Sequence, residues 1–412
     1  MLRIEAGLMI PGDGEPVPDA VVVADGTTIS YAGPAAGAPD TPSAAVATAA
    51  VVMPGMWDCH GHFFGERTFD LAKVVQEPTA LRAARSVPDL GRALAAGITS
   101  VREVGGLGVH LAKAVAEGSV AGPSIYAAGS ILSITGGHGD LHCYPLSWVN
   151  EFSQFGGMVR LADGVPECML AAREQLRMGA RVIKVCASGG VLSEIDDPIH
   201  QQFTDDELRA IVEVAGLADR AVAAHCHGKP GIMAAIRAGV QTIEHGSYLD
   251  EEACDAMLEQ GTILVPTRTI VEDILAHLDD VPAYAAAKLT ALAATHADAV
   301  RMAIERGVTV AMGTDIGLSG PDLPNSWGQN GAELAHLVTL GMTPLQAIAA
   351  ATAIAPRTLG PQAPRSGQLA AGYDADILTL DADPLADISV LTQPDHITGV
   401  WTYGHRVKGN DT

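Results

Sequence analysis

The sequence predicts a mixed α/β fold, namely a (β/α)8 TIM barrel with a small β-sandwich domain formed from both termini. Short β-branched runs alternate with Ala/Leu-rich helical segments through the middle of the chain, whereas both flanks lack a helical period. Alternating strands and helices require parallel strands joined by helical crossovers. The length of 412 residues suits one large domain with an appendage, or two domains.

Eight segments in the middle of the chain are predicted to be strands, because each is short and rich in apolar or β-branched residues. These segments are 51–60, 98–104, 124–130, 181–187, 221–226, 241–246, 262–267 and 308–314. The predicted helices lie between them, near 79–96, 109–117, 166–178, 204–218, 231–238, 250–259, 284–306 and 330–340. Eight strand–helix units match a closed barrel better than an open sheet, and a barrel places its chemistry at the C-terminal ends of the strands.

The two flanks are predicted to pair into the small β domain. Alternating apolar strands occur in ADILTL (375–380) and ITGVWTYGHRV (397–407). We therefore expect the small domain to comprise residues 1–56 and 360–412, and the barrel to comprise residues 57–359.

Composition excludes several function classes. The chain has 25 Lys and Arg against 48 Asp and Glu, a net charge of −23, and no basic run, which argues against a nucleic-acid partner. It has no apolar run long enough for a membrane span and no signal-peptide pattern, so we expect a cytoplasmic protein that acts on a small molecule. Six cysteines without a CxxC pair suggest neither a disulfide framework nor a cysteine zinc site. Barrel helices with so few charges favour a homo-oligomer.

The motif DCHGH, residues 58–62, ends the first predicted strand. Residues two apart in a strand point to the same side, so His60 and His62 project together toward the barrel mouth. Two imidazoles placed in this way can share one metal ion. Two hydrogen-bonded turn histidines are the alternative interpretation.

Four further ionisable residues fall at or near the ends of later predicted strands, where they strengthen the metal interpretation. They are Lys184 in the fourth, His225 in the fifth, His245 in the sixth and Asp315 after the eighth. Taken singly, the lysine could be an ion-paired residue and the aspartate part of a turn. Their joint placement at one rim favours a common site.

These residues resemble the amidohydrolase superfamily of metal-dependent hydrolases. The tail SGQLAAGYDADILTLDADPL is similar to the C-terminal strand signature of that superfamily. The segments IKVCASGG, HCHG, AIRAGVQTIEHG and TGGHGD resemble the branch that contains Xaa-Pro dipeptidases, related carboxypeptidases, imidazolonepropionases and ochratoxin-hydrolysing amidases.

The resemblance implies a centre of two divalent metal ions, with Zn²⁺ as the expected metal. The implied ligands are His60, His62 and Asp315 for one ion, His225 and His245 for the other, and Lys184, carboxylated on its amine, as the bridge. The spacing of the motifs favours His225 over His227 as ligand, which leaves His227 with a supporting or substrate-binding role, or with no role.

The chemistry of amide hydrolysis explains why such residues are needed. A divalent metal ion lowers the pKa of bound water and polarises the carbonyl group. An unmodified lysine ammonium would repel metal ions, so Lys184 must be modified or point elsewhere. Asp315 can bind metal through one oxygen while the other takes a proton and passes it to the leaving amine.

Other residues near the predicted barrel mouth are candidates for substrate contacts. His138 in TGGHGD could donate to the developing oxyanion, with an exposed Gly-rich loop as the alternative. Residues 138–165 form a long connection that is a candidate lid. Lys229 and Arg268 could receive a substrate carboxylate, although an ordinary surface ion pair is the favoured interpretation of each.

The sequence therefore predicts a binuclear metal amidohydrolase. Its expected substrate is an amide between an acyl group and an amino acid or similar carboxylate-bearing amine, such as a dipeptide or an N-acyl amino acid, including ochratoxin-like amides. The alternative is a cyclic amide hydrolase of the imidazolonepropionase type. A non-catalytic scaffold is a third possibility, but a scaffold has no need for six polar groups at one rim.

Overall fold

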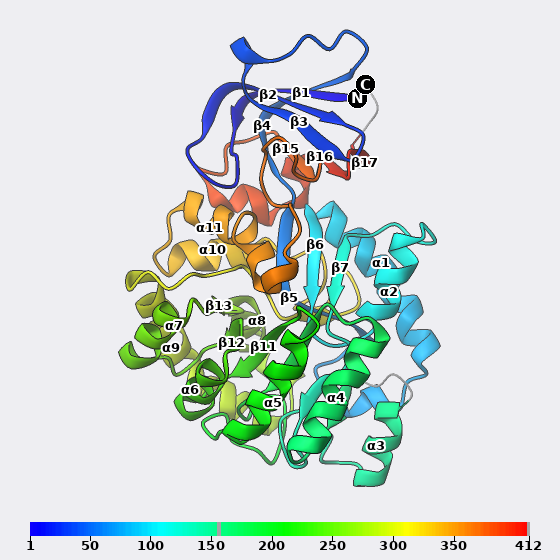
Figure 1. Cartoon of the computed structure of the whole chain (residues 1–412), viewed down its shortest axis with the longest axis vertical. Coiled ribbons are helices and arrows are strands. Elements are labelled where there is room, and N and C mark those ends of the chain that lie inside the picture. The colour runs from blue at the N-terminus through cyan, green and yellow to red at the C-terminus, as the bar shows by residue number, and fades with distance from the viewer. Residues whose placement is uncertain (155–157, 410–412) are drawn as a thin grey trace.

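The computed structural model of the chain describes residues 1–154 and 158–409. Figure 1 shows a β-sheet part, formed by the blue and red ends of the chain, above a larger part in which helices surround parallel strands. The predicted α/β class is confirmed.

The upper part is one seven-stranded sheet with the order β17-β16-β15-β4-β1-β2-β3. Its strands are β1 Leu2–Met9, β2 Val17–Asp25, β3 Thr28–Pro34, β4 Ala45–Pro54, β15 Ile377–Leu380, β16 Ile397–Thr402 and β17 His405–Lys408. Strand β4 is parallel to β1 and antiparallel to β15, so it joins the strands from the two ends of the chain. Because these strands merge into one sheet, the two-layered β-sandwich that the sequence predicted is not confirmed.

The larger part contains two parallel sheets. One has six strands in the order β13-β12-β11-β10-β8-β9, and the other has four in the order β14-β5-β6-β7. Their strands are β5 Met56–Glu66, β6 Ile98–Glu103, β7 Ser124–Ala127, β8 Ile131–Ser133, β9 Val159–Leu161, β10 Val182–Cys186, β11 Ala221–Cys226, β12 Thr242–His245, β13 Ile263–Val265 and β14 Ile316–Leu318. Most of these strands are buried along their whole length, as expected for parallel sheets covered by helices.

Backbone hydrogen bonds connect the two parallel sheets. Arg181 N donates to Ala127 O at 2.8 Å, and Ala311 N donates to Leu264 O at 2.9 Å. The predicted eighth strand, 308–314, is not a regular strand; it contributes an isolated bridge at Val310, and β14 follows it. The described ladders do not form one continuous eight-stranded ring, so the closed barrel stays a prediction.

Each of the eight predicted helices has a counterpart in the structure. The counterparts are α1 Thr79–Ala95, α2 Gly108–Ala116, α4 Val165–Met178, α5 Asp205–Gly216, α6 Lys229–Ala238, α7 Glu251–Gln260, α9 Ala283–Glu305 and α10 Ala332–Thr339. Three helices were not predicted: α3 Leu146–Gln154, α8 Arg268–Ala276 and α11 Pro344–Ala351. Sequence signals fix several ends, because α5 and α11 begin with capping boxes and α4, α6 and α7 end at left-handed glycines.

Helix α3 and strand β9 lie in the long connection that the sequence presented as a candidate lid; part of that connection, residues 155–157, lies outside the described residues. Within the described ranges, no helix combines the length and apolar character needed to span a bilayer.

Candidate functional site

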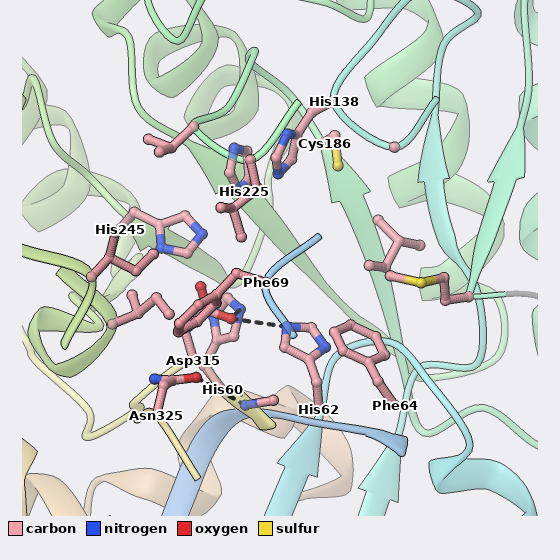
Figure 2. A pocket seen from close by; sticks show the side chains of 18 of the residues that line it. His60, His62, Phe64, Phe69, His138, Cys186, His225, His245, Asp315 and Asn325 are labelled. Carbon is pink, nitrogen blue, oxygen red and sulfur yellow. Dashed lines mark hydrogen bonds and ion pairs between the residues drawn. The ribbon is translucent and has the colours of Figure 1, made fainter. Parts of the chain in front are cut away.

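All six predicted metal ligands line one cavity formed by the parallel strands and the segments next to them. Figure 2 shows His60, His62, His225, His245 and Asp315 facing this cavity. Strand β5 supplies the first two histidines, β10 supplies Lys184, β11 supplies His225, and β12 supplies His245. Asp315 immediately precedes β14.

The first donor set consists of His60, His62 and Asp315, whose ligand atoms all lie within 4.8 Å of one another. Asp315 Oδ1 lies 3.0 Å from His62 Nε2 and 3.5 Å from His60 Nε2. Burial acts to raise the pKa of Asp315, but the neighbouring imidazoles outweigh it and hold that pKa below its usual value. The carboxylate is therefore ionised and able to bind a cation.

The second donor set consists of His225, His227 and His245, again with ligand atoms within 4.8 Å of one another. The sequence placed His227 beside the ligands and not among them, whereas the structure brings it as close as the other two. Burial lowers the pKa of His227 to about 3 and that of His60 to about 4. Both rings are neutral near pH 7, which is the form that binds metal.

Lys184 lines the same cavity and interacts electrostatically with members of both donor sets. Its Nζ is 3.4 Å from His60 Nε2, and the side chain is buried. Burial lowers the pKa of this ammonium. A buried lysine with a lowered pKa is a better nucleophile than an exposed one, as carboxylation requires.

Hydrogen bonds to the outer ring nitrogens orient several of these histidines. His62 Nδ1 donates to Gly105 O at 2.8 Å, and His60 Nδ1 lies 2.7 Å from Glu244 Oε2. His245 Nδ1 is 2.7 Å from Thr267 Oγ1. Each contact engages Nδ1 and leaves Nε2 as the free ring nitrogen for a metal ion. The donor types and their orientation thus fit divalent metal ions such as Zn²⁺.

Asp58 connects the strand that carries His60 to the segment before Asp315 through hydrogen bonds. Its Oδ1 accepts from the backbone N of His60 at 3.0 Å and from that of Thr314 at 3.1 Å. Its Oδ2 accepts from the Thr314 hydroxyl at 2.5 Å and from Asn330 at 2.7 Å. The segment before Asp315 is therefore fixed against the strand that carries His60.

His138 lines the cavity, so its ring is not part of an exposed loop. The ring stacks on His225 with centroids 4.2 Å apart, and its Nδ1 lies 2.8 Å from Ser193 Oγ. Burial lowers the pKa of His138. His138 therefore lies next to a proposed metal ligand, which is where a residue that donates to the oxyanion has to be.

Neither Lys229 nor Arg268 lines the cavity. Lys229 Nζ lies 2.5 Å from Asp250 and 2.6 Å from Glu252, at the surface. Arg268 is ion-paired with Glu272 at 2.6 Å. Both residues form the ordinary ion pairs that the sequence left open as the alternative.

Two apolar walls flank the proposed ligands, and no motif in the sequence predicted them. One wall contains Phe64, Leu141, Met158 and Val159; the other contains Phe69, Val191, Val271, Ile274, Leu289 and Leu292. The second wall comes largely from α8 and α9, and an apolar helical stripe near the predicted barrel mouth was its only sequence signal. Among the described residues that line the cavity, Lys184 is the one Lys or Arg side chain.

Comparisons with known proteins agree with this site. The ochratoxinase of Aspergillus niger is 43% identical to the chain over 424 residues, which cover 98% of the chain and 86% of that protein. The crystal structure of A. niger ochratoxinase matches with a TM-score of 0.94 at 43% identity, over 99% of this chain and 96% of that one. A prolidase solved in complex with N-methylphosphonate-L-proline matches with a TM-score of 0.89 at 33% identity, over 99% of this chain and 100% of that one.

A more distant match is the imidazolonepropionase of Streptomyces griseus, which is 26% identical over 96% of this chain and 95% of that protein. The family model that matches is that of the amidohydrolase family, over residues 51–407. The chain, whose predicted metal ligands gather at one cavity, belongs to the amidohydrolase family and is a hydrolase that acts on amide bonds.

Proposed function

We propose that the chain is a binuclear metal amidohydrolase that cleaves the amide between an acyl group and an amino acid or similar carboxylate-bearing amine. The observation that carries the proposal is the pair of donor sets at one cavity that Lys184 also lines. Similarity to an ochratoxinase and to a prolidase supports an amide of this class.

The first set, His60, His62 and Asp315, would hold one ion, and His225 with His245 would hold the other. Lys184, carboxylated on Nζ, would bridge them, and Zn²⁺ is the proposed metal. When bound, such ions lower the pKa of water and polarise the scissile carbonyl.

The protein side chains supply the proton transfers. Asp315 is ionised and faces the site, so it can take a proton from the attacking water and pass it to the leaving nitrogen. His138 stands beside His225, where an imidazole N–H can donate to the oxygen of the tetrahedral intermediate.

The apolar walls favour a substrate with large apolar groups, because burying such groups is the main interaction the cavity offers. A substrate carboxylate would meet His227 or His138, since Lys229 and Arg268 lie outside the cavity. The similarity to an imidazolonepropionase keeps cyclic amide hydrolysis as the alternative activity. Action in the cytoplasm as a homo-oligomer stays part of the proposal.

The test is a hydrolysis screen of the zinc-loaded protein against N-acyl amino acids, dipeptides and cyclic amides. We expect cleavage of acyl amides with apolar groups, and kcat/KM lowered about 10- to 10³-fold when the carboxylate is amidated. Equal cleavage of free and amidated substrates would contradict carboxylate recognition. Turnover of imidazolones alone would establish the alternative.

A further inference from the structure

A buried ion pair lies beneath the metal-binding histidines. Arg102 on β6 and Glu244 on β12 come from different parallel sheets, and both side chains are fully buried. Arg102 Nη2 lies 2.8 Å from both carboxylate oxygens of Glu244. Neither side chain is among the residues that line the cavity.

The pair is fully hydrogen-bonded by its surroundings. Arg102 Nε donates to Cys59 O at 2.6 Å, and Nη1 donates to the hydroxyl of Thr242 at 2.9 Å. The Thr242 hydroxyl in turn donates to Glu244. A buried ion pair persists only when its polar atoms are satisfied in this way.

Glu244 fixes the proton of His60. A carboxylate that already accepts from Arg102 cannot donate, so the contact of 2.7 Å with His60 Nδ1 requires the proton on Nδ1. Nε2 of His60 then carries a lone pair, and it faces Asp315 and Lys184. By contrast, the partner of His62 Nδ1 is the uncharged carbonyl of Gly105, and the partner of His245 Nδ1 is the uncharged hydroxyl of Thr267.

The pair also ties the two donor sets together. Glu244 is the residue before His245, and Arg102 holds the carbonyl of Cys59, the residue before His60. The rings of His60 and His245 have centroids 5.0 Å apart. A substitution of Arg102 or Glu244 is therefore expected to shift His60 in the first donor set and His245 in the second.

We infer that Arg102 and Glu244 are positioning residues that orient His60 toward its metal ion and set its distance from the His245 donor set. The inference rests on the proposed metal function. An ordinary structural ion pair would stabilise the fold without a specific effect on metal binding, and this difference makes the inference testable.

The test measures metal affinity on the full chain, without substrate. Apo protein is titrated with Zn²⁺ against a chromophoric chelator, and the Co²⁺-substituted protein is examined by its visible absorption. We expect Glu244→Gln to weaken at least one site about 10- to 100-fold and to change the Co²⁺ spectrum. The matched control is Glu333→Gln, which alters another fully buried carboxylate that accepts from Thr269 and contacts none of the proposed ligands.

A milder pair of variants covers the case in which Glu244→Gln does not fold. Thr242→Val removes a buried hydroxyl that donates to Glu244, and Thr269→Val removes one that donates to Glu333. We expect weaker Zn²⁺ binding and an altered Co²⁺ spectrum only for Thr242→Val. Wild-type affinity and spectrum in Thr242→Val, or equal losses in both threonine variants, would overturn the inference.

The same titration separates this inference from the proposed function. If the unaltered chain binds no Zn²⁺ above background, the binuclear function itself fails. If the unaltered chain binds two ions and the Glu244 and Thr242 variants bind them equally tightly, the positioning role fails alone.

Discussion

At the scale of single residues, the site is marked by backbone strain. Asp315 has φ of 60° and His245 has φ of 71°, both in the left-handed region. This conformation costs a non-glycine residue about 1–3 kcal/mol and persists only where the surroundings enforce it. Thr314, the residue before Asp315, donates its backbone N–H and its hydroxyl to the Asp58 carboxylate, and these two bonds hold the strained segment in place. Both strained residues are proposed ligands that line the cavity, His245 at the end of β12 and Asp315 just before β14.

Asp315→Asn tests the proposed proton transfer. We expect kcat to fall on the order of 10²-fold or more, because an amide cannot take up the proton of the attacking water. Steady-state kinetics on an N-acyl amino acid measure the effect, and metal content near that of the unaltered protein shows that the loss is chemical. Turnover close to normal would assign the proton transfer to another group.

Lys184→Ala tests the proposed bridge. We expect loss of bound metal and of most activity, with partial recovery of both on addition of a short-chain carboxylic acid that replaces the missing anion. Elemental analysis and activity are the measurements. The control is Lys229→Ala, because this lysine lies in a surface ion pair outside the cavity. Full activity in Lys184→Ala would make the lysine structural.

Much of the candidate metal site was predictable because strand geometry is simple. The two-residue period of a strand placed His60 and His62 on one side, and the ends of parallel strands meet at one rim. The sequence could not resolve the direction of side chains beyond the strand ends, so Lys229 and Arg268 stayed candidates for the cavity beside the favoured ion-pair interpretation, which the structure shows. Arg102 and Glu244 went unnoticed, although a charged residue in each of two buried strands is a signal of a buried pair.

At the scale of elements, α9 is attached to the loop 189–199, part of which lines the cavity. Lys288 Nζ donates to Gly190 O at 3.1 Å and to Ser193 O at 2.7 Å, and it also donates to the carbonyl of Asp196. This loop carries Val191, which lines the cavity, and Ser193 contacts His138. One lysine therefore fixes part of an apolar wall and the orientation of His138.

Lys288→Met tests this loop attachment. Three carbonyls lose their donor, so we expect a more mobile loop, a several-fold higher KM for apolar substrates, and faster amide exchange in residues 189–199. Hydrogen exchange and steady-state kinetics are the measurements. Lys113→Met, on the exposed side of α2, is the control. An unchanged KM together with unchanged exchange would contradict the prediction.

The elements themselves were predictable where local signals agree with packing. All eight predicted helices have counterparts, and a capping box begins α5 while left-handed glycines end α4, α6 and α7. Helix α8 was missed because its segment RTIVEDILA is short and contains β-branched residues, which weaken a helical pattern. Packing of Val271 and Ile274 against Leu289 and Leu292 of α9 overrides that local preference.

At the scale of the whole molecule, a buried carboxyl group lies where the seven-stranded sheet meets β5. Asp376 accepts from the backbone N of Tyr403 at 2.8 Å, and its carbonyl accepts from Gly55 N at 2.8 Å. Burial raises the pKa of this carboxyl from 3.8 to about 7. The junction therefore contains a group that prefers to be protonated in the folded state.

The raised pKa of Asp376 predicts how stability depends on pH. Between pH 3.8 and about pH 7, the unfolded pKa and the folded pKa of Asp376, this carboxyl group binds more protons in the folded state than in the unfolded state. The free energy of unfolding therefore falls as the pH rises through this range. Asp376→Asn should remove this slope and stabilise the protein at pH 8 by on the order of 1–4 kcal/mol. Thermal melts of both proteins from pH 4 to pH 8 measure it, and parallel curves would contradict it.

The shared sheet has a consequence for the order in which the protein is synthesised and folded. Pro54 of β4 pairs with Ile377 of β15, so a growing chain completes β1 to β4 long before their last partner strand leaves the ribosome. Until then the edge of β4 has unpaired backbone groups, which are a template for association with other chains. Premature termination anywhere before Ile377 would therefore yield a product with an open edge, prone to aggregation even when every proposed metal ligand has been made.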